Sequence, residues 1–138
     1  MDIRISELVP RHYYLFHKGY FRMKNGKRLK DHHFCTTNPA AIRLLQAEFR
    51  KKIAQNPDCK AWTLVPDPET PSEDDTLWCS CPACRAFSAK EQNRMAVNAA
   101  AEILEAEMPD AILYYYEADD DSGEEPDISM RANTSSNS

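Results

Sequence analysis

The chain has 138 residues, of which 42% are hydrophobic and 28% charged, with a formal net charge of -5. This length fits one ordinary domain with enough apolar content for a core. No apolar run approaches the roughly 20 residues that a membrane span needs, and the first residues lack the charged-then-apolar pattern of a secretory signal. We therefore expect a soluble chain with no membrane partner, and its cellular location stays open.

Basic residues concentrate in the first part of the chain. Residues 1–60 carry 13 of the 17 Lys and Arg but 5 of the 22 Asp and Glu. In RHYYLFHKGYFRMKNGKRLK, residues 11–30, aromatic and basic side chains alternate, which suits nucleic acid because cations neutralise phosphates and rings stack on bases. A solvated hairpin with a few core aromatics is the favoured interpretation, since no recognised nucleic-acid motif accompanies the charge.

The first predicted elements are a hairpin, a strand and a helix. Asn25-Gly26 is the preferred pair for a tight turn, so a hairpin or looped excursion is expected there. The run HHFC, residues 32–35, predicts a first strand. Asn38 and Pro39 then suit a helix start, and Asn56-Pro57 ends the helix. Its apolar positions recur at helical spacing: Ile42, Leu45, Phe49 and Ile53.

The next part of the chain predicts a second strand, a second helix and a third strand. CKAWTLV, residues 59–65, suits a buried strand and runs into an acidic, proline-rich loop. Ser88 and Glu91 form a capping box for a helix that ends at Met108-Pro109. AILYYYEA, residues 111–118, predicts the third strand. From residue 119 onward the composition indicates a disordered acidic tail, which leaves one α/β domain over residues 1–118 and the tail over 119–138.

The order strand-helix-strand-helix-strand predicts parallel strands with right-handed crossover helices. The loops that leave the carboxyl ends of such strands all lie at one edge of the sheet. Cys35 follows the first predicted strand, and Cys79, Cys81 and Cys84 follow the second. We therefore expect these four thiols to converge. Four thiolates satisfy the tetrahedral coordination of zinc and close the site to water, which is typical of a structural ion.

Other interpretations of the cysteines remain open. Two of them could form a disulfide in an exported protein, or His33 could replace a cysteine, because it shares a strand face with Cys35. Redox catalysis ranks third: Cys81 and Cys84 precede a helix, but the extra thiols depart from the thioredoxin-like pattern. Small buried hydrophobes are the weakest interpretation. Cys59 is predicted to be a lone core thiol at the opposite edge.

Carboxylates also follow the predicted strands. Asp67, with Glu69, follows the second strand, and Glu117 follows the third. Paired carboxylates are what glycoside hydrolysis uses, one as the proton donor and one as the nucleophile or base. Asp67 and Glu117 are therefore the candidate catalytic residues. Trp78 could stack on a sugar ring, although covering the metal site is the favoured role.

Five segments carry a resemblance to a known family: GYFRMKNGKR, HHFCTTNPAAIRLL, NPDCKAWTLVPD, WCSCPACRAF and NAAAEILEAEMPDAILYYYE. Over about residues 17–117 they resemble the bacterial family described as domain of unknown function 4838. The resemblance implies a glycoside-hydrolase-like barrel that often accompanies carbohydrate-binding modules. It also implies a substrate-facing role for Asp67 and pairs Cys35 with the later cysteines.

A complete TIM-type (β/α) barrel needs eight strand-helix units and ~250 residues, so this chain cannot close one. It is a piece of a barrel, a truncated relative or a small open α/β domain that keeps the metal-bound loop. We expect a carbohydrate-associated domain with a structural zinc site, inactive as an isolated chain. The expected partners are carbohydrate and either the remainder of a larger barrel or an oligomeric partner. The alternative is a non-enzymatic zinc-binding module that contacts protein or nucleic acid through its basic N-terminal half; nucleic acid is not the favoured partner.

Overall fold

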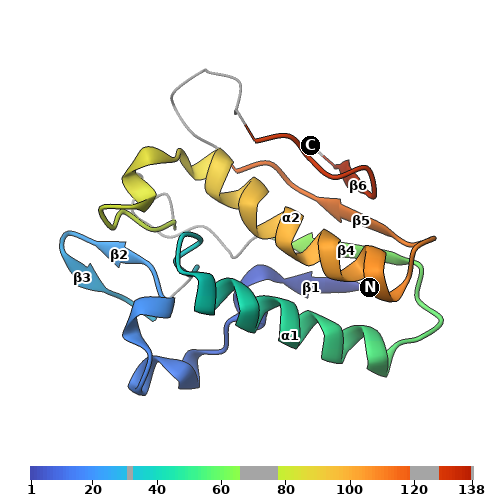
Figure 1. Cartoon of the computed structure of the whole chain (residues 1–138), viewed down its shortest axis with the longest axis horizontal. Coiled ribbons are helices and arrows are strands. Elements are labelled where there is room, and N and C mark those ends of the chain that lie inside the picture. The colour runs from blue at the N-terminus through green and yellow to red at the C-terminus, as the bar shows by residue number, and fades with distance from the viewer. Residues whose placement is uncertain (31–32, 66–77, 119–127, 138) are drawn as a thin grey trace.

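The computed structural model of the chain describes residues 1–30, 33–65, 78–118 and 128–137. Within these residues, parallel strands form one sheet in the order β1-β4-β5-β6 (Figure 1). Their bounds are Asp2–Arg4, Ala61–Val65, Ile112–Tyr115 and Thr134–Ser136. A separate antiparallel hairpin consists of β2, Met23–Lys24, and β3, Lys27–Arg28. The predicted α/β class with parallel strands is therefore confirmed.

Two long helices cover the sheet. They are α1, Pro39–Gln55, and α2, Ala89–Glu107. Figure 1 shows them side by side, with β1 and β4 behind them. Short 3-10 helices lie in the connections: η1, Ile5–Leu8; η2, Arg11–Leu15; η3, Lys18–Tyr20; and η4, Cys84–Ala86. Among the described residues, no helix has the length and apolar character needed to cross a bilayer.

Both predicted helix starts are confirmed. The side chain of Asn38 accepts hydrogen bonds from the backbone N–H groups of Ala40 and Ala41, and Pro39 occupies the first turn. Ser88 and Glu91 bond reciprocally to each other's backbone N–H groups, as a capping box requires. Since the helices run antiparallel to the strands they connect, both capped ends lie at the carboxyl edge of the sheet.

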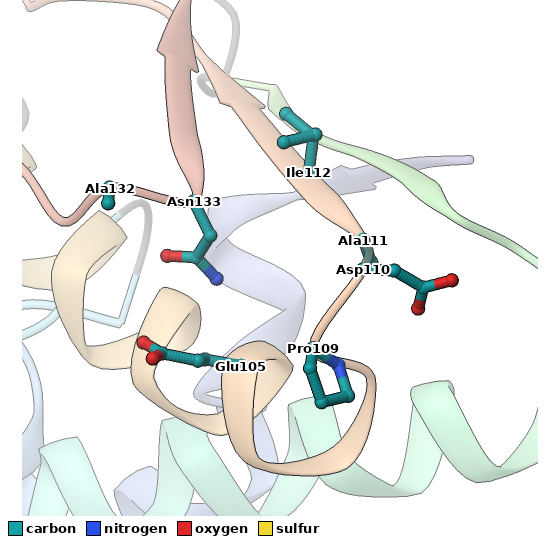
Figure 2. Close-up of a pocket in the computed structure, with 7 residues that line it drawn as sticks. All are labelled: Glu105, Pro109, Asp110, Ala111, Ile112, Ala132 and Asn133. Carbon is teal, nitrogen blue, oxygen red and sulfur yellow. The ribbon is translucent and has the colours of Figure 1, made fainter.

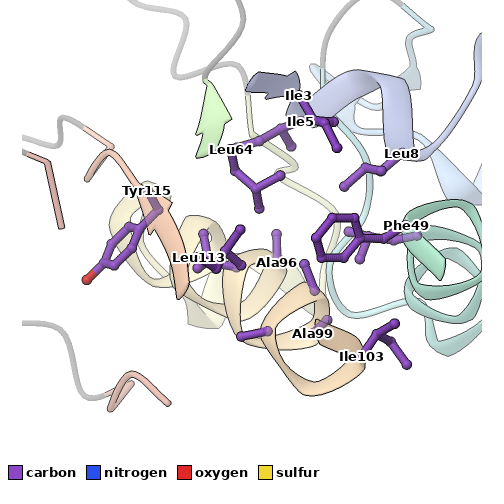
Figure 3. Close-up of a cluster of buried hydrophobic side chains, with 14 of the residues drawn as sticks. Ile3, Ile5, Leu8, Phe49, Leu64, Ala96, Ala99, Ile103, Leu113 and Tyr115 are labelled. Carbon is purple, nitrogen blue, oxygen red and sulfur yellow. The ribbon is translucent and has the colours of Figure 1, made fainter. Parts of the chain in front are cut away.

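The hydrophobic core lies between the sheet and the two helices (Figure 3). Alternation along β1, β4 and β5 buries every second side chain against the helices, while the residues between them are exposed or half-buried. Trp62 packs edge-on against Phe49 of α1, with ring centroids 5.5 Å apart. The buried strand residues are Ile3, Trp62, Leu64, Leu113 and Tyr115.

The predicted first strand at residues 32–35 is wrong. The first strand of the sheet is β1, Asp2–Arg4, which pairs in parallel with β4. Residues 33–35 instead run beside residues 20–22, through a bridge between Phe21 and Phe34 and a bond from Cys35 N to Tyr20 O. Residues 33–35 thus pair with the preceding segment rather than with the sheet, in which both neighbours of β4 are other strands, β1 and β5.

The prediction of a disordered tail is wrong for residues 128–137. β6 pairs in parallel with β5, and the preceding segment is bound along α2. The amide of Asn98 donates to Ser129 O at 2.9 Å and accepts from Arg131 N at 3.0 Å, and the amide of Asn133 donates to Ala101 O at 3.0 Å. Polar bonds to the backbone thus order a segment with little apolar surface. Residues 119–127 lie outside the described residues, so the proposed domain boundary stays a prediction.

Candidate metal centre

Four cysteines meet at the carboxyl edge of the sheet. Cys35 lies in the segment that leads into α1, while Cys79, Cys81 and Cys84 lie in the segment that leads into α2. Each of the four is at most 4% exposed, and together they form a cluster separate from the main core. The predicted convergence is therefore present, although the strand expected to deliver Cys35 is not the one that forms.

The four sulfur atoms are close enough to share one ion. Their Sγ atoms all lie within 4.8 Å of one another. Cys35 Sγ is 3.7 Å from the Sγ atoms of both Cys81 and Cys84. All five cysteines of the chain are free, and these separations are far above the roughly 2.0 Å of a disulfide bond.

Backbone N–H groups and a threonine hydroxyl lie beside the sulfurs. Cys79 Sγ accepts from the N–H of Met23 at 3.3 Å and from that of Cys81 at 3.4 Å. Cys81 Sγ accepts from the N–H of Cys84 at 3.4 Å. The Thr37 hydroxyl lies 3.2 Å from Cys84 Sγ and 3.4 Å from Cys35 Sγ. Such contacts stabilise thiolates more than thiols, because the ionised sulfur is the stronger acceptor.

Hydrogen bonds and burial together shift the pKa values of the four cysteines. The pKa of Cys35 lies far below its ordinary value because Cys79 and Cys84 bond to its sulfur. The pKa values of Cys79 and Cys84 are raised, chiefly by their bonds to Cys35. Burial works to raise the pKa of Cys81, but bonds led by the Cys84 N–H lower it overall. The pKa values of Cys35 and Cys81 are thus lowered and those of Cys79 and Cys84 raised, and a lowered pKa favours the thiolate form that binds a metal ion.

A fixed positive charge lies beside the cluster. Arg28 Nη1 is 3.8 Å from Cys79 Sγ and donates to Phe21 O at 2.9 Å. Burial works to lower the pKa of Arg28, but a hydrogen bond to Cys35 and the charges of Cys35, Cys79 and Cys81 raise it. Sequence reasoning missed this residue, since it lies 51 positions from Cys79 in the chain.

Gln92 of α2 binds the cysteine loop, the segment of residues 79–84, from the buried side of that loop. Its side chain is buried and bonds to Cys79 at two points, accepting from the N–H at 3.1 Å and donating to the carbonyl at 2.9 Å. Ser80 attaches the same loop to the hairpin, because its N–H and hydroxyl both donate to the carbonyl oxygen of Met23 in β2. The loop is thus fixed to α2 and to the β2–β3 hairpin at once.

The neighbouring aromatic residues form a stack rather than a binding surface. Trp78 is 4% exposed and stacks on His33, with ring centroids 4.2 Å apart and planes 11° apart. Its burial argues against the sugar-stacking role and agrees with a covering role. Among the described residues, the group of converging side chains consists of the three later cysteines and Cys35. His33 is not part of that group. Cys59 is half-buried and donates to Ala61 O at 3.2 Å, away from the cluster.

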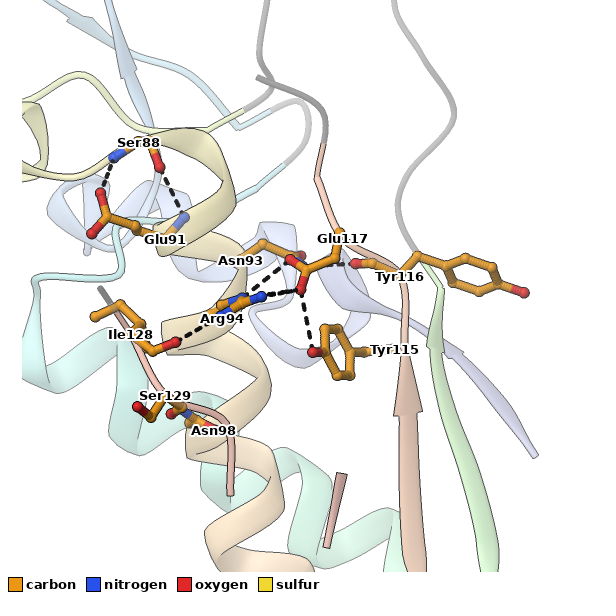
Figure 4. Close-up of polar contacts among 10 residues, drawn as sticks. All are labelled: Ser88, Glu91, Asn93, Arg94, Asn98, Tyr115, Tyr116, Glu117, Ile128 and Ser129. Atoms are coloured by element: carbon orange, nitrogen blue, oxygen red, sulfur yellow. Dashed lines mark hydrogen bonds and ion pairs between the residues drawn. The ribbon is translucent and has the colours of Figure 1, made fainter. Parts of the chain in front are cut away.

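The structure describes only one of the two candidate catalytic carboxylates. Asp67 lies outside the described residues, as does its neighbour Glu69. Glu117 follows β5, and its carboxylate accepts from Arg94 Nη2 at 2.6 Å and Nε at 3.0 Å (Figure 4). Tyr115 donates to the same carboxylate at 3.3 Å, and Arg94 Nη1 donates to Ile128 O at 2.9 Å. Glu117 thus joins β5 to α2 through Arg94, and Arg94 in turn joins α2 to the C-terminal segment.

A shallow pocket lies at the other edge of the sheet, before β5 (Figure 2). Its two carboxylates are already paired: Glu105 with Arg131 at 2.6 Å, and Asp110 with Lys60 at 2.9 Å. The pocket therefore offers neither the cysteines nor a free acid-base pair. Its lining residues are Glu105, Pro109, Asp110, Ala111, Ile112, Ala132 and Asn133.

The fold and the cluster define a parallel α/β domain with four buried cysteines, in an arrangement consistent with a metal site. The chain belongs to the family described as domain of unknown function (DUF4838), whose family model matches residues 5–127. The resemblance seen in the sequence is therefore confirmed, and the match is longer at both ends than the 17–117 expected. Neither the curated proteins nor the solved structures contain a match.

Proposed function

We propose that the chain binds one zinc ion through Cys35, Cys79, Cys81 and Cys84, and that this ion has a structural role. The observation that carries the proposal is the convergence of four buried sulfurs from two separate segments. Zn–S bonds of about 2.3 Å in a tetrahedron place the sulfurs about 3.8 Å apart. The 3.7 Å separations from Cys35 to Cys81 and Cys84 fit that requirement.

The donor set favours zinc in a closed site. Four thiolates leave no coordination position for water, so the ion would not activate a nucleophile. Iron also accepts four thiolates, but among the described residues no redox partner for it is evident. Here zinc would act as a cross-link between two segments of the chain. It would join the segment before α1 to the segment before α2, next to the hairpin that bonds to Cys79.

We further propose that the domain is a carbohydrate-associated part of a glycoside-hydrolase-like (β/α) barrel. The sequential order β1-β4-β5-β6, with all strands parallel, supports this, because barrels add strands in chain order whereas doubly wound sheets reverse it. Asp67, which lies outside the described residues, and Glu117, which follows β5 and is paired with Arg94, remain the proposed catalytic residues. Barrel closure would need strands from a further segment or from an oligomeric partner.

A second candidate is a non-enzymatic zinc module that binds protein or nucleic acid through its N-terminal half. Residues 10–30 carry seven Lys or Arg and no Asp or Glu. At the end of η2, Leu15 and Phe16 are 73% and 82% exposed. Binding that weakens steeply with salt would favour this candidate, whereas binding to polysaccharide would favour the first.

The deciding experiment is metal analysis of the purified chain and two variants. We expect about one zinc ion per wild-type chain and per Cys59→Ala chain, because Cys59 lies outside the cluster. Cys81→Ala should lose the ion and melt at a lower temperature. A wild-type chain without stoichiometric metal, together with an unchanged melting temperature for Cys81→Ala, would refute the zinc proposal.

A pull-down on insoluble polysaccharides tests the carbohydrate proposal separately. The zinc-loaded chain should be retained, and Asp67→Asn should be retained less. Glu73→Gln, in the same acidic stretch, serves as the charge-matched control. Equal retention of wild type and Asp67→Asn, or no retention of either, would contradict the proposed carbohydrate-binding role of Asp67.

A further inference from the structure

The proposed metal centre leaves a charge that the protein must neutralise. Four thiolates and one divalent cation carry a formal charge of about -2. The four cysteines are buried, with Cys84 fully so. A buried charge without a partner costs several kcal/mol, so some group near the sulfurs must offset it. Backbone N–H groups supply partial charges, but they carry no net charge.

Arg28 is placed to offset one of these two negative charges. Its Nη1 lies 3.8 Å from Cys79 Sγ, on the same sulfur that accepts from the Met23 N–H at 3.3 Å. Met23 and Arg28 are directly paired across the β2–β3 hairpin. The two residues therefore approach Cys79 from the same hairpin, Met23 through its backbone and Arg28 through its guanidinium.

Local structure fixes the position of the guanidinium. Asn25 and Gly26 both have positive φ, 54° and 78°, which gives the tight turn that sets the pairing of Met23 with Arg28. Arg28 Nη1 also donates to Phe21 O at 2.9 Å, and Arg28 O accepts from the Tyr14 hydroxyl at 2.8 Å. Both ends of Arg28 are therefore held before any ion binds.

We propose that Arg28 is the charge partner of the metal–thiolate centre, and that the hairpin positions it so that metal affinity depends on its positive charge. The inference rests on the proposed zinc site. It adds a positioning residue outside the cysteine motif, and it gives the basic hairpin a role at that site. Arg28 does not ligate the ion; it acts through Cys79.

The test compares Arg28→Gln, Arg28→Lys and Lys27→Gln in the full chain. Lys27 is exposed, lies next to Arg28 in β3 and contributes the same charge to the hairpin, so Lys27→Gln is the matched control. Zinc affinity is measured by competition with a chromophoric chelator. Arg28→Gln should bind zinc about 10- to 100-fold more weakly, the usual effect of losing a group that supports metal ligands. Arg28→Lys should recover most of the affinity, and Lys27→Gln should match wild type.

Melting with and without zinc separates this role from simple packing. A charge partner is needed chiefly when the thiolates and the ion are present, so Arg28→Gln should reduce the melting temperature of the zinc-loaded chain more than that of the metal-free chain. Equal reductions in both states, with zinc affinity equal to that of Lys27→Gln, would overturn the proposal. If Arg28→Gln does not fold, a tenfold or greater loss in Arg28→Lys would overturn it as well. Failure of wild type to bind zinc would instead refute the zinc site.

Discussion

Gln92 and Cys79 are joined through both halves of the glutamine amide. Cys79 N–H donates to Oε1 at 3.1 Å, and Nε2 donates to Cys79 O at 2.9 Å. The same Nε2 lies within 3.5 Å of Cys84 O and 3.3 Å of Phe87 O. One buried side chain of α2 thus organises the backbone of the cysteine loop without contacting a sulfur. The loop geometry depends on the helix beneath it.

Gln92→Leu should therefore destabilise the fold and weaken metal binding together. Leucine has a similar volume but leaves the buried N–H and carbonyl of Cys79 without a side-chain partner, at a cost of about 1–3 kcal/mol. Urea unfolding measures the loss. Gln55→Leu, at the exposed end of α1, is the control and should change the free energy of unfolding little. A loss no larger than that of Gln55→Leu would contradict the role of Gln92.

Thr37→Val should weaken metal binding with little effect on the metal-free fold. Valine keeps the shape of threonine but removes the hydroxyl that lies 3.2 Å from Cys84 Sγ and 3.4 Å from Cys35 Sγ. Loss of a hydrogen bond to a charged acceptor is worth about 1.5–3 kcal/mol, which corresponds to a drop in zinc affinity of about tenfold or more. Competition titration measures it, with Thr63→Val in β4 as the control. Unchanged affinity would show that the hydroxyl does not support the thiolates.

Glu117→Gln should loosen the C-terminal segment. The Arg94–Glu117 pair is mostly buried, with each side chain 19% exposed, and Arg94 also holds Ile128 O. Glutamine removes the negative charge that faces Arg94, and we expect a loss of about 1–3 kcal/mol in unfolding free energy. Hydrogen exchange should accelerate at residues 128–137.

The control for this pair is the exposed ion pair between Arg50 and Glu107, with side chains 52% and 41% exposed. Arg50→Gln should cost less than about 1 kcal/mol, because solvent screens surface charges. Equal losses in Arg50→Gln and Glu117→Gln would mean that Glu117 has no special structural role.

Ionisation of Tyr115 should lower the free energy of unfolding at strongly alkaline pH. Burial, and next the charge of Glu117, raise the pKa of its hydroxyl above the ordinary value of 10.0. The unfolded chain therefore loses this proton first as the pH rises, so the contribution of Tyr115 is complete below pH about 10 and is lost as the pH climbs through the folded-state pKa. Unfolding free energies measured from pH 8 to 11 check this. Tyr115→Phe should show a shallower decline, and an identical slope would contradict the assignment.

Metal removal should act first on the groups around the sulfurs. Without the proposed ion, the four cysteines lose their common ligand, and the N–H groups of Met23, Cys81 and Cys84 lose strong acceptors. Chelation should therefore speed hydrogen exchange at these amides more than at the buried strands β4 and β5. Re-addition of zinc should restore protection. Uniform acceleration across the domain would instead indicate global unfolding.

Local signals in the sequence determined much of this protein. Asn38, Pro39 and the Ser88–Glu91 capping box fixed where both helices begin, because capping involves residues a few positions apart. The alternation along β4 and β5, and the Asn25-Gly26 turn, likewise depend on neighbours in the chain. The spacing of Cys79, Cys81 and Cys84 brought three thiols together in the same way.

Only the tertiary structure decided the remaining features. β1 and β6 have three residues each, too few to leave a periodic pattern, and they become strands because β4 and β5 offer open edges for pairing. The contacts of Arg28, Thr37 and Gln92 with the cysteine cluster join residues distant in the chain. Such contacts depend on how the hairpin and helices pack against the sheet, which no local pattern specifies, because their free energy arises only once the elements have met.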